Sequence, residues 1–202
     1  IEAEKYLNLD KKNLNVSNYR NGDAIPQVKN ASAWANLTTG AWCYYENKKA
    51  NGTKYGKLYN WYAVNDPRGL APKGYHIPTD KEWKTLINSL GGDSVAGKKM
   101  KSTSGWRKGN GTNSSGFSGL PGGFREGADG YFGYGQKYMM VGEVLGDAIF
   151  DNAGWWSSSE GNYSAGFGAE YGAEVILCNT GNFIDMYSKV KQNGYSVRCL
   201  RD

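Results

Sequence analysis

The most strongly specified stretch of this sequence is Gly74-Tyr-His-Ile-Pro-Thr-Asp-Lys-Glu-Trp-Lys-Thr-Leu-Ile-Asn-Ser-Leu-Gly-Gly92. Thr79 precedes Glu82 at the spacing of a capping box, in which each side chain accepts a hydrogen bond from the other residue's backbone N–H. Apolar residues then recur at i, i+3, i+4 and i+7, which gives one helical stripe of Trp83, Leu86, Ile87 and Leu90. Gly91 and Gly92 supply a left-handed stop. We therefore predict a core helix after Thr79, a structural anchor rather than an active site.

A second helix is expected directly after the first. Asp93–Met100 is predicted to be helical, with Asp93 or Ser94 as the cap and three lysines, Lys98, Lys99 and Lys101, near the negative C-terminal end. These lysines form the only tight basic cluster in a chain of net charge +5. Because the other basic residues are scattered, we interpret the cluster as a solvated helix face and expect no nucleic-acid partner.

Short elements and long loops account for the rest of the chain. Upstream, the patterns predict a strand over 13–16, a one-turn helix over 32–37, an aromatic strand over 41–45, and a buried strand or short helix over 58–64. Downstream, they predict a surface loop over 102–116 with only Trp106 to bury, a hairpin over 130–135, and a central strand over 194–201. In that strand one face carries Tyr195, Val197, Cys199 and Arg201, and the other carries Ser196, Arg198 and Leu200.

Length and composition fit one domain spanning 1–202, in which 1–12 form an extended leader. Gly (29 residues) and Tyr (15 residues) are abundant, which favours loops and short strands with aromatic rings supplying much of the burial. No apolar run reaches the roughly 18 residues that a transmembrane helix needs, so we expect no transmembrane segment.

The residues that most often carry chemistry are sparse. His76 is the single histidine, and a hydrogen-bonded, buried role is expected for it rather than a catalytic one. Cys43, Cys178 and Cys199 are odd in number and widely spaced, so at most one disulfide forms within the chain and no zinc or redox motif is present. Two carboxylate pairs, Glu170 with Glu174 and Asp147 with Asp151, have a spacing that would allow calcium chelation, but we interpret them as solvated loop residues. We expect no cofactor. The one exception that the spacing of these carboxylates allows is a structural calcium ion.

Five blocks of the sequence together resemble one known family: Lys57-Leu-Tyr-Asn-Trp61, Ala71-Pro-Lys-Gly-Tyr-His-Ile-Pro-Thr-Asp-Lys-Glu-Trp83, Gly119-Leu-Pro-Gly-Gly-Phe-Arg125, Trp155-Trp-Ser-Ser-Ser-Glu160 and Ser196-Val-Arg-Cys-Leu-Arg-Asp202. In this order they are similar to the Fibrobacter succinogenes major paralogous domain. The resemblance implies an α+β chain with a C-type-lectin-like fold of the kind shared with formylglycine-generating enzymes. That fold has mixed, mostly antiparallel short strands, two helices and long loops. It also favours the helix over 58–64.

The resemblance to this family implies a location as well as a fold. Such proteins are common on the surfaces of Bacteroidetes, often as lipoproteins, so an extracellular or cell-surface location is expected, with a lipid anchor on a removed N-terminal segment as one version. Family cysteines near Gly52 and Ala71 are missing here. Any bridge would then use two of Cys43, Cys178 and Cys199, and the pairing that we expect is Cys43–Cys199.

Enzymes related to this fold need groups that the chain lacks. The formylglycine-generating type uses a close cysteine pair near the C-terminal strand, and the iron-dependent sulfoxide-forming type uses several histidines, whereas Cys199 has no near neighbour and His76 stands alone. Calcium-dependent lectins use Glu-Pro-Asn or Gln-Pro-Asp motifs, which are also absent. We therefore expect a protein that is not an enzyme.

The C-terminal third suits recognition, because Tyr supplies contact area while Ser, Gly and Asn supply adaptable hydrogen bonds. The expected ligand-binding residues are Asn162, Tyr163, Phe167, Tyr171, Asn179, Asn182, Phe183 and Tyr187. The expected function is adhesion to a protein or glycan ligand, with a variable protein of a diversity-generating retroelement as its sharper form. A phage or pilus tip protein is the alternative, and the enzyme class is disfavoured. Should these residues prove to be core, the alternative surfaces are the loop over 102–116 and the hairpin over 131–138.

Overall fold

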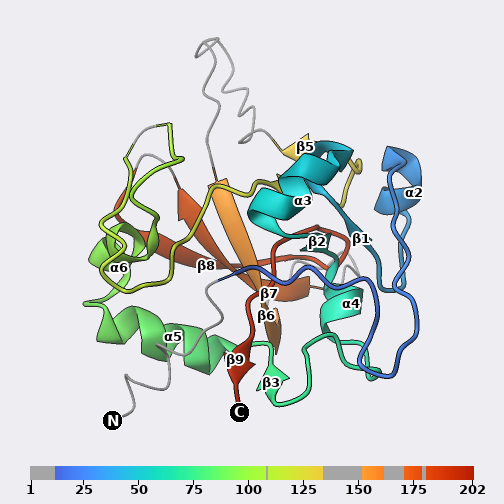
Figure 1. Ribbon diagram of the computed structural model, residues 1–202, viewed down its shortest axis with the longest axis horizontal. Coiled ribbons are helices and arrows are strands. Elements are labelled where there is room, and N and C mark those ends of the chain that lie inside the picture. Colours follow the sequence, from blue (N-terminus) through green and yellow to red (C-terminus); the bar gives the residue numbers. More distant parts are fainter. Residues whose placement is uncertain (1–11, 108, 134–151, 162–170, 179–180) are drawn as a thin grey trace.

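The computed structural model describes residues 12–107, 109–133, 152–161, 171–178 and 181–202 (Figure 1). Its helices are α2 (Ala31–Ala35), the 3-10 helix η1 (Tyr45–Asn47), α3 (Lys49–Tyr55), α4 (Trp61–Val64), α5 (Asp80–Ser89) and α6 (Asp93–Met100). Its strands are β1 (Trp42–Cys43), β2 (Leu58–Tyr59), β3 (Tyr75–His76), β4 (Phe124–Arg125), β5 (Phe132–Gly133), β6 (Asn152–Glu160), β7 (Tyr171–Cys178), β8 (Ile184–Val190) and β9 (Leu200–Arg201). All pairings between these named strands are antiparallel. The chain is therefore a mixed α+β protein of mostly short antiparallel strands.

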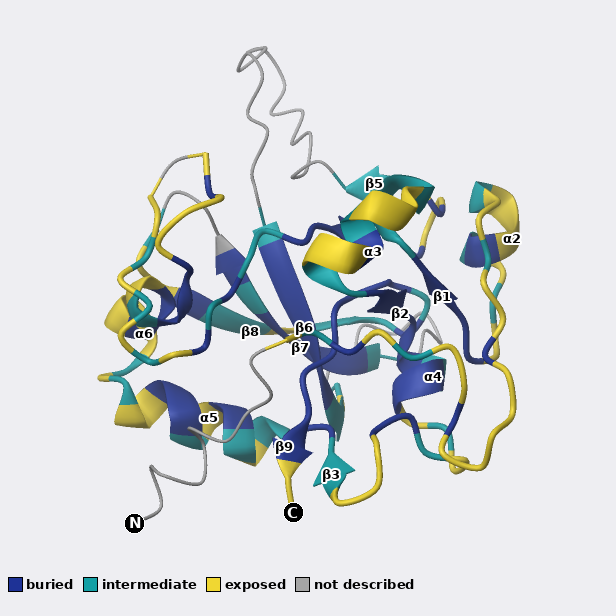
Figure 2. Cartoon of the chain, viewed as in Figure 1, coloured by how far each residue is buried: buried dark blue, intermediate teal, exposed yellow. Residues whose placement is uncertain are grey.

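The largest sheet has the order β6-β7-β8 and separates two parts of the core. On one face, Trp155, Val175 and Ile184 pack with apolar residues of α5 and α6. On the other face, Trp156 joins Tyr59, Trp61 and residues of the C-terminal segment. Figure 2 shows the resulting pattern, in which β6 is buried over residues 153–157 and less buried towards its ends, and α5 presents one buried and one exposed side.

The anchor helix has the expected construction. The Thr79 hydroxyl accepts from the Glu82 backbone N–H, and the Glu82 carboxylate accepts from the Thr79 backbone N–H at 2.9 Å, so the capping box is complete. Trp83, Leu86 and Ile87 are buried, as the stripe predicts. The second helix spans Asp93–Met100 as predicted, although no side chain caps its start.

The C-terminal segment is central, as predicted, but it is not one continuous strand. Gly194 bridges to Arg125, Tyr195 to Tyr59 and Ser196 to Trp155, and only β9 continues as a named strand, paired with β3. Because each of these three residues pairs with a different neighbouring element, no long hydrogen-bonded ladder forms. The predicted alternation holds for the buried residues, since Tyr195, Val197 and Cys199 share one core cluster while Leu200 lies in the other.

Several local predictions need correction. No strand forms over 13–16; instead Leu14 donates its backbone N–H to Val197 and accepts from Lys57. The segment 58–64 divides into β2 and α4, and the aromatic strand over 41–45 shortens to β1. Helix α3 was not predicted, because Gly and Asn inside it disfavour helix. Gly52 is nevertheless required there, since a Cβ would lie 2.0 Å from the Tyr44 ring.

The expected Cys43–Cys199 disulfide is also wrong. Both residues are buried thiols that are not bonded to each other. Cys43 packs with Trp34, Ala41 and Leu58, whereas Cys199 packs in the cluster around Tyr59 and Trp156. Burial raises the pKa of the Cys43 thiol to about 12, which keeps it protonated and unreactive.

Candidate functional site

The residues of the quoted sequence blocks hold the scaffold together. Arg125 is 1% exposed, and its guanidinium donates to the backbone carbonyls of Gly130, Val28 and Lys29 at 2.7, 2.7 and 2.9 Å. It also lies 4.5 Å from the centre of the Trp34 ring. The side chain therefore joins the β4–β5 hairpin to the segment before α2, a structural role.

Asn60 acts in the same way at the start of α4. Its Oδ1 atom accepts from the backbone N–H groups of Ala41 and Ala63, and its Nδ2 donates to the Thr39 carbonyl. The side chain is fully buried, so it caps the helix and fixes the preceding chain at once.

A third junction is built on Asn13. Its Oδ1 accepts from the Trp155 indole at 2.8 Å and from the Arg198 guanidinium at 2.6 Å, while its Nδ2 donates to the Tyr55 carbonyl at 2.7 Å. Residues far apart in sequence therefore meet at one amide.

His76 connects β3 to α5 and to the C-terminal residues. Its Nδ1 lies 2.7 Å from the Asp202 carboxylate and its Nε2 lies 3.0 Å from the Glu82 carboxylate. Burial lowers the pKa of His76, but the two hydrogen-bonded carboxylates outweigh burial and leave the pKa raised. The expected hydrogen bonding is present, yet the ring is half-buried rather than buried, because it serves an ion-paired junction near the surface.

Glu174 was expected in a solvated loop, and this interpretation is wrong. It lies on β7, opposite Trp156 on β6 and Tyr187 on β8, and it is fully buried. Burial raises the pKa of its carboxyl to about 8, although the Lys189 ammonium lies 4.0 Å away and favours the charged form. The Tyr195 hydroxyl also faces the carboxyl, but neither oxygen makes a well-formed hydrogen bond within the described residues. Its possible partner Glu170, like the pair Asp147 and Asp151, lies outside these residues.

The predicted ligand-binding residues do not form one described surface. Asn162, Tyr163, Phe167 and Asn179 lie outside the described residues. Tyr171 and Asn182 flank opposite ends of the β7–β8 pairing, which at about 3.3 Å per residue separates them by roughly 20 Å. Asn182, Phe183 and Tyr187 are exposed, the last two by 41% and 50%, whereas Tyr171 is half-buried.

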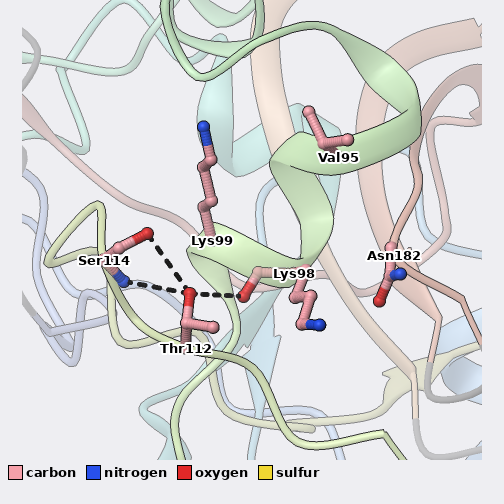
Figure 3. Close-up of a pocket in the computed structure, with 6 residues that line it drawn as sticks. All are labelled: Val95, Lys98, Lys99, Thr112, Ser114 and Asn182. Carbon is pink, nitrogen blue, oxygen red and sulfur yellow. Dashed lines mark hydrogen bonds between the residues drawn. The ribbon is translucent and has the colours of Figure 1, made fainter.

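Asn182 lies at the hollow we call the α6 pocket (Figure 3). This pocket has a volume of about 390 Å³ and is lined by Val95, Lys98, Lys99, Thr112, Ser114 and Asn182. Helix α6 and the loop over 111–116 form its walls, and the Asn182 carbonyl accepts from the Lys98 backbone N–H at 3.1 Å, which fixes the segment before β8 against the helix. Asn182 and the loop were both named from the sequence. The lysines were missed as site residues, because a basic cluster at a helix C-terminus is equally well explained by the helix dipole.

A second hollow, of about 290 Å³, lies beside α4 and includes Asp66, Arg68 and Lys191. Its charges are already paired within the protein. Arg68 contacts Asp66 at 2.8 Å, and Lys191 contacts Glu160 at 3.2 Å. The α6 pocket differs because its lining contains two lysines and no acidic residue. It is therefore the better candidate for binding.

Other kinds of site have less support. Across the described part of the chain, no three His, Cys, Asp or Glu residues lie together in a way that could hold a metal ion. The same part of the chain holds no helix that is long and apolar enough to cross a membrane.

Comparison with known proteins gave one match. The family model described as the Fibrobacter succinogenes major domain matches residues 11–201. No curated protein and no solved structure matches the chain.

Proposed function

The chain belongs to the Fibrobacter succinogenes major domain family, and from this premise we propose that it is a non-enzymatic ligand-binding domain of a cell-surface or secreted protein. The proposal includes a C-type-lectin-like fold, with a protein or glycan bound at the α6 pocket and the exposed residues next to it. The observation that carries it is the α6 pocket itself, a hollow to which a helix, a loop and the segment before β8 each contribute residues.

The division of labour between residues supports this proposal. The junction residues use their polar groups for hydrogen bonds within the protein. Arg125 bonds to backbone carbonyls, Asn60 to backbone N–H groups and Asn13 to buried side chains. Asn182 and Lys98 instead have side chains with no hydrogen bond to other described residues. A frame whose junction residues are hydrogen-bonded within the protein, together with polar side chains left without such bonds at one hollow, is the arrangement of a binding scaffold.

In its sharper form, the proposal is that the chain is a variable protein of a diversity-generating retroelement, with the variation falling on the same surface. Asn182, Phe183 and Tyr187 are exposed, so substitutions there leave the frame intact. A reverse transcriptase gene next to the coding sequence would favour this form, and a lipoprotein signal upstream would favour the bacterial surface over a phage or pilus tip.

The test is an array of glycans and surface proteins probed with the pure domain, followed by a paired scan of melting and binding. We expect saturable binding to at least one array member. Asn182→Ala and Tyr187→Ala should keep the melting temperature, with Asn182→Ala weakening binding, while Trp156→Ala should lose the fold. The proposal would be contradicted if the domain bound no glycan and no protein on the array, or if Asn182→Ala left its binding unchanged.

A further inference from the structure

We propose that the outer edge of β8 is a dimerisation surface, at which this strand pairs antiparallel with β8 of a second copy of the chain, centred on Tyr187. This inference goes beyond the proposed function, because it concerns the assembly of the chain with itself rather than a ligand of the α6 pocket. It follows from the open edge of the strand and from the order of charges along it.

Strand β8 is the outer strand of the largest sheet, whose order is β6-β7-β8. The opposite edge strand, β6, is already paired on its outer side with Gly123 and Ser196. On the outer side of β8, no described residue forms a backbone hydrogen bond with residues 184–189, and such bonds occur only just beyond, at the Asn182 and Val190 carbonyls. The edge is therefore open over one short stretch.

The pairing register fixes which backbone groups face this open edge. The Trp156 N–H donates to the Ser196 carbonyl at 3.1 Å, so the backbone of Trp156 faces away from β7. Backbone directions alternate in antiparallel sheets, and Trp156 lies opposite Glu174, which in turn lies opposite Tyr187. The backbone of Tyr187 therefore faces β7, and the residues on either side of it present their N–H and C=O groups to the open edge.

A second copy fits this edge in one register. In a two-fold symmetric, antiparallel pair centred on Tyr187, Met186 lies opposite the partner's Ser188, and each such pair exchanges two backbone hydrogen bonds. Asp185 then lies opposite the partner's Lys189, and symmetry repeats this contact. Centring the pair on Asp185 or on Lys189 would place like charges opposite each other, so the charges favour the register centred on Tyr187.

Both charges are available for this contact. The half-buried Asp185 side chain has no hydrogen bond or ion pair within the described part of the chain. The Lys189 ammonium lies 4.0 Å from Glu174, but the pKa of about 8 keeps that carboxyl mostly protonated at neutral pH, so the lysine charge is not cancelled. Charges on an edge strand discourage pairing with unrelated strands. A second copy instead cancels both charges, which makes the edge selective for itself.

The experiment measures the sedimentation velocity of the whole chain over a concentration series. Because the contact is short, we expect a weak dimer, with a dissociation constant in the micromolar to millimolar range. Asp185→Lys and Lys189→Asp each turn both contacts into like-charge pairs and should weaken dimerisation about tenfold or more. An equimolar mixture of these two variants should form dimers again, because every contact then joins one lysine to one aspartate.

Two further variants separate charge from backbone. Lys84→Asp makes the same charge reversal at an exposed position of α5 and should leave dimerisation unchanged. Ser188→Pro removes an N–H that faces away from β7, so the circular dichroism spectrum should be kept while the dimer is lost.

The proposal is overturned by a parent chain that stays monomeric at about 1 mM. It is equally overturned if folded Asp185→Lys or Ser188→Pro dimerises as the parent does, or if the mixture of the two folded charge variants stays monomeric. Should one charge variant fail to fold, the other and Ser188→Pro decide the result.

Discussion

Glu174 shows how one buried residue can govern the pH dependence of the whole fold. Its folded pKa of about 8 lies above the value of about 4.3 expected in the unfolded chain, so folding favours the protonated form. Stability is therefore lost as pH rises from about 4 through 8. The cause is desolvation, since the carboxyl lies inside the sheet beside Trp156 and Tyr195.

Glu174→Gln should remove this penalty, because a neutral amide of similar shape replaces a carboxyl that must ionise. We expect the variant to melt near the parent at pH 5 and above it at pH 9, measured by thermal denaturation. Glu160→Gln on the neighbouring strand β6 is the control, because that side chain is 69% exposed and its ion pair contributes little. A Glu174→Gln variant that melts below the parent at pH 9 would show that the ionised carboxylate is stabilised in the fold.

At the scale of elements, α5 offers the clearest stability test. Thr79→Ala removes the hydroxyl that accepts from Glu82 and should cost about 1 kcal/mol. Trp83→Ala leaves a cavity beside Phe117 and should cost about 3–5 kcal/mol. Trp83→Phe should cost less, because the indole N–H is buried and lacks a hydrogen-bond partner among the described residues. Urea denaturation gives all three values, and a Trp83→Ala variant as stable as the parent would remove Trp83 from the core.

Elements with strong local signals were predictable, and those made by distant contacts were not. Helix α5 has its cap, stripe and stop within one stretch, so its bounds follow from the sequence. Helix α3 exists because of what packs on it, such as Tyr44 against Gly52, and the strand predicted over 41–45 is limited to β1 by its short pairing with β2. Distant contacts also explain why the site was not predicted from the sequence, since the α6 pocket forms only where a loop folds back over the end of a helix.

The junction of β3, β9 and α5 at His76 should add a second pH dependence. The raised pKa of His76 means that its stabilisation is complete below about pH 6.5 and is lost as pH rises through the folded value. The pKa of Glu82 is lowered despite its burial, because the Thr79 N–H and His76 favour the carboxylate, so its contribution is lost as pH falls below about 4.3. The junction is therefore strongest at about pH 5–6.

His76→Gln should be less stable than the parent at pH 5.5 and close to it at pH 9. Because Glu174 also weakens the parent as pH rises, the quantity to follow is the difference between parent and variant in thermal melts. A difference that stays constant across this range would mean that His76 contributes no charge-dependent stability.

At the scale of the whole molecule, the chain is held by polar junctions that join distant segments. Asn13 contacts Trp155 and Arg198, and Arg125 contacts the segment before α2. The sequence blocks that identified the family contain Arg125, Trp155 and Arg198 but not Asn13, and a sequence pattern has no period that links residue 13 to residue 198. Burial of the C-terminal segment was predictable from its apolar residues, whereas the side chain that joins it and β6 to the N-terminal segment was not.

Asn13→Ala should therefore destabilise the protein far more than its half-buried position indicates. The change leaves the Trp155 indole and the Arg198 Nε without their acceptor, and each unsatisfied buried donor costs about 1–3 kcal/mol. We expect a total loss of about 2–4 kcal/mol in urea denaturation. Asn13→Asp keeps an oxygen acceptor and should recover part of the lost stability.

Asn15→Ala is the matched control, since exposed Asn15 makes a single 3.3 Å bond to Gly52 and should change stability by less than about 1 kcal/mol. Equal effects of Asn13→Ala and Asn15→Ala would mean that solvent or neighbouring groups replace the Asn13 acceptor, and that the N-terminal junction does not hold the fold.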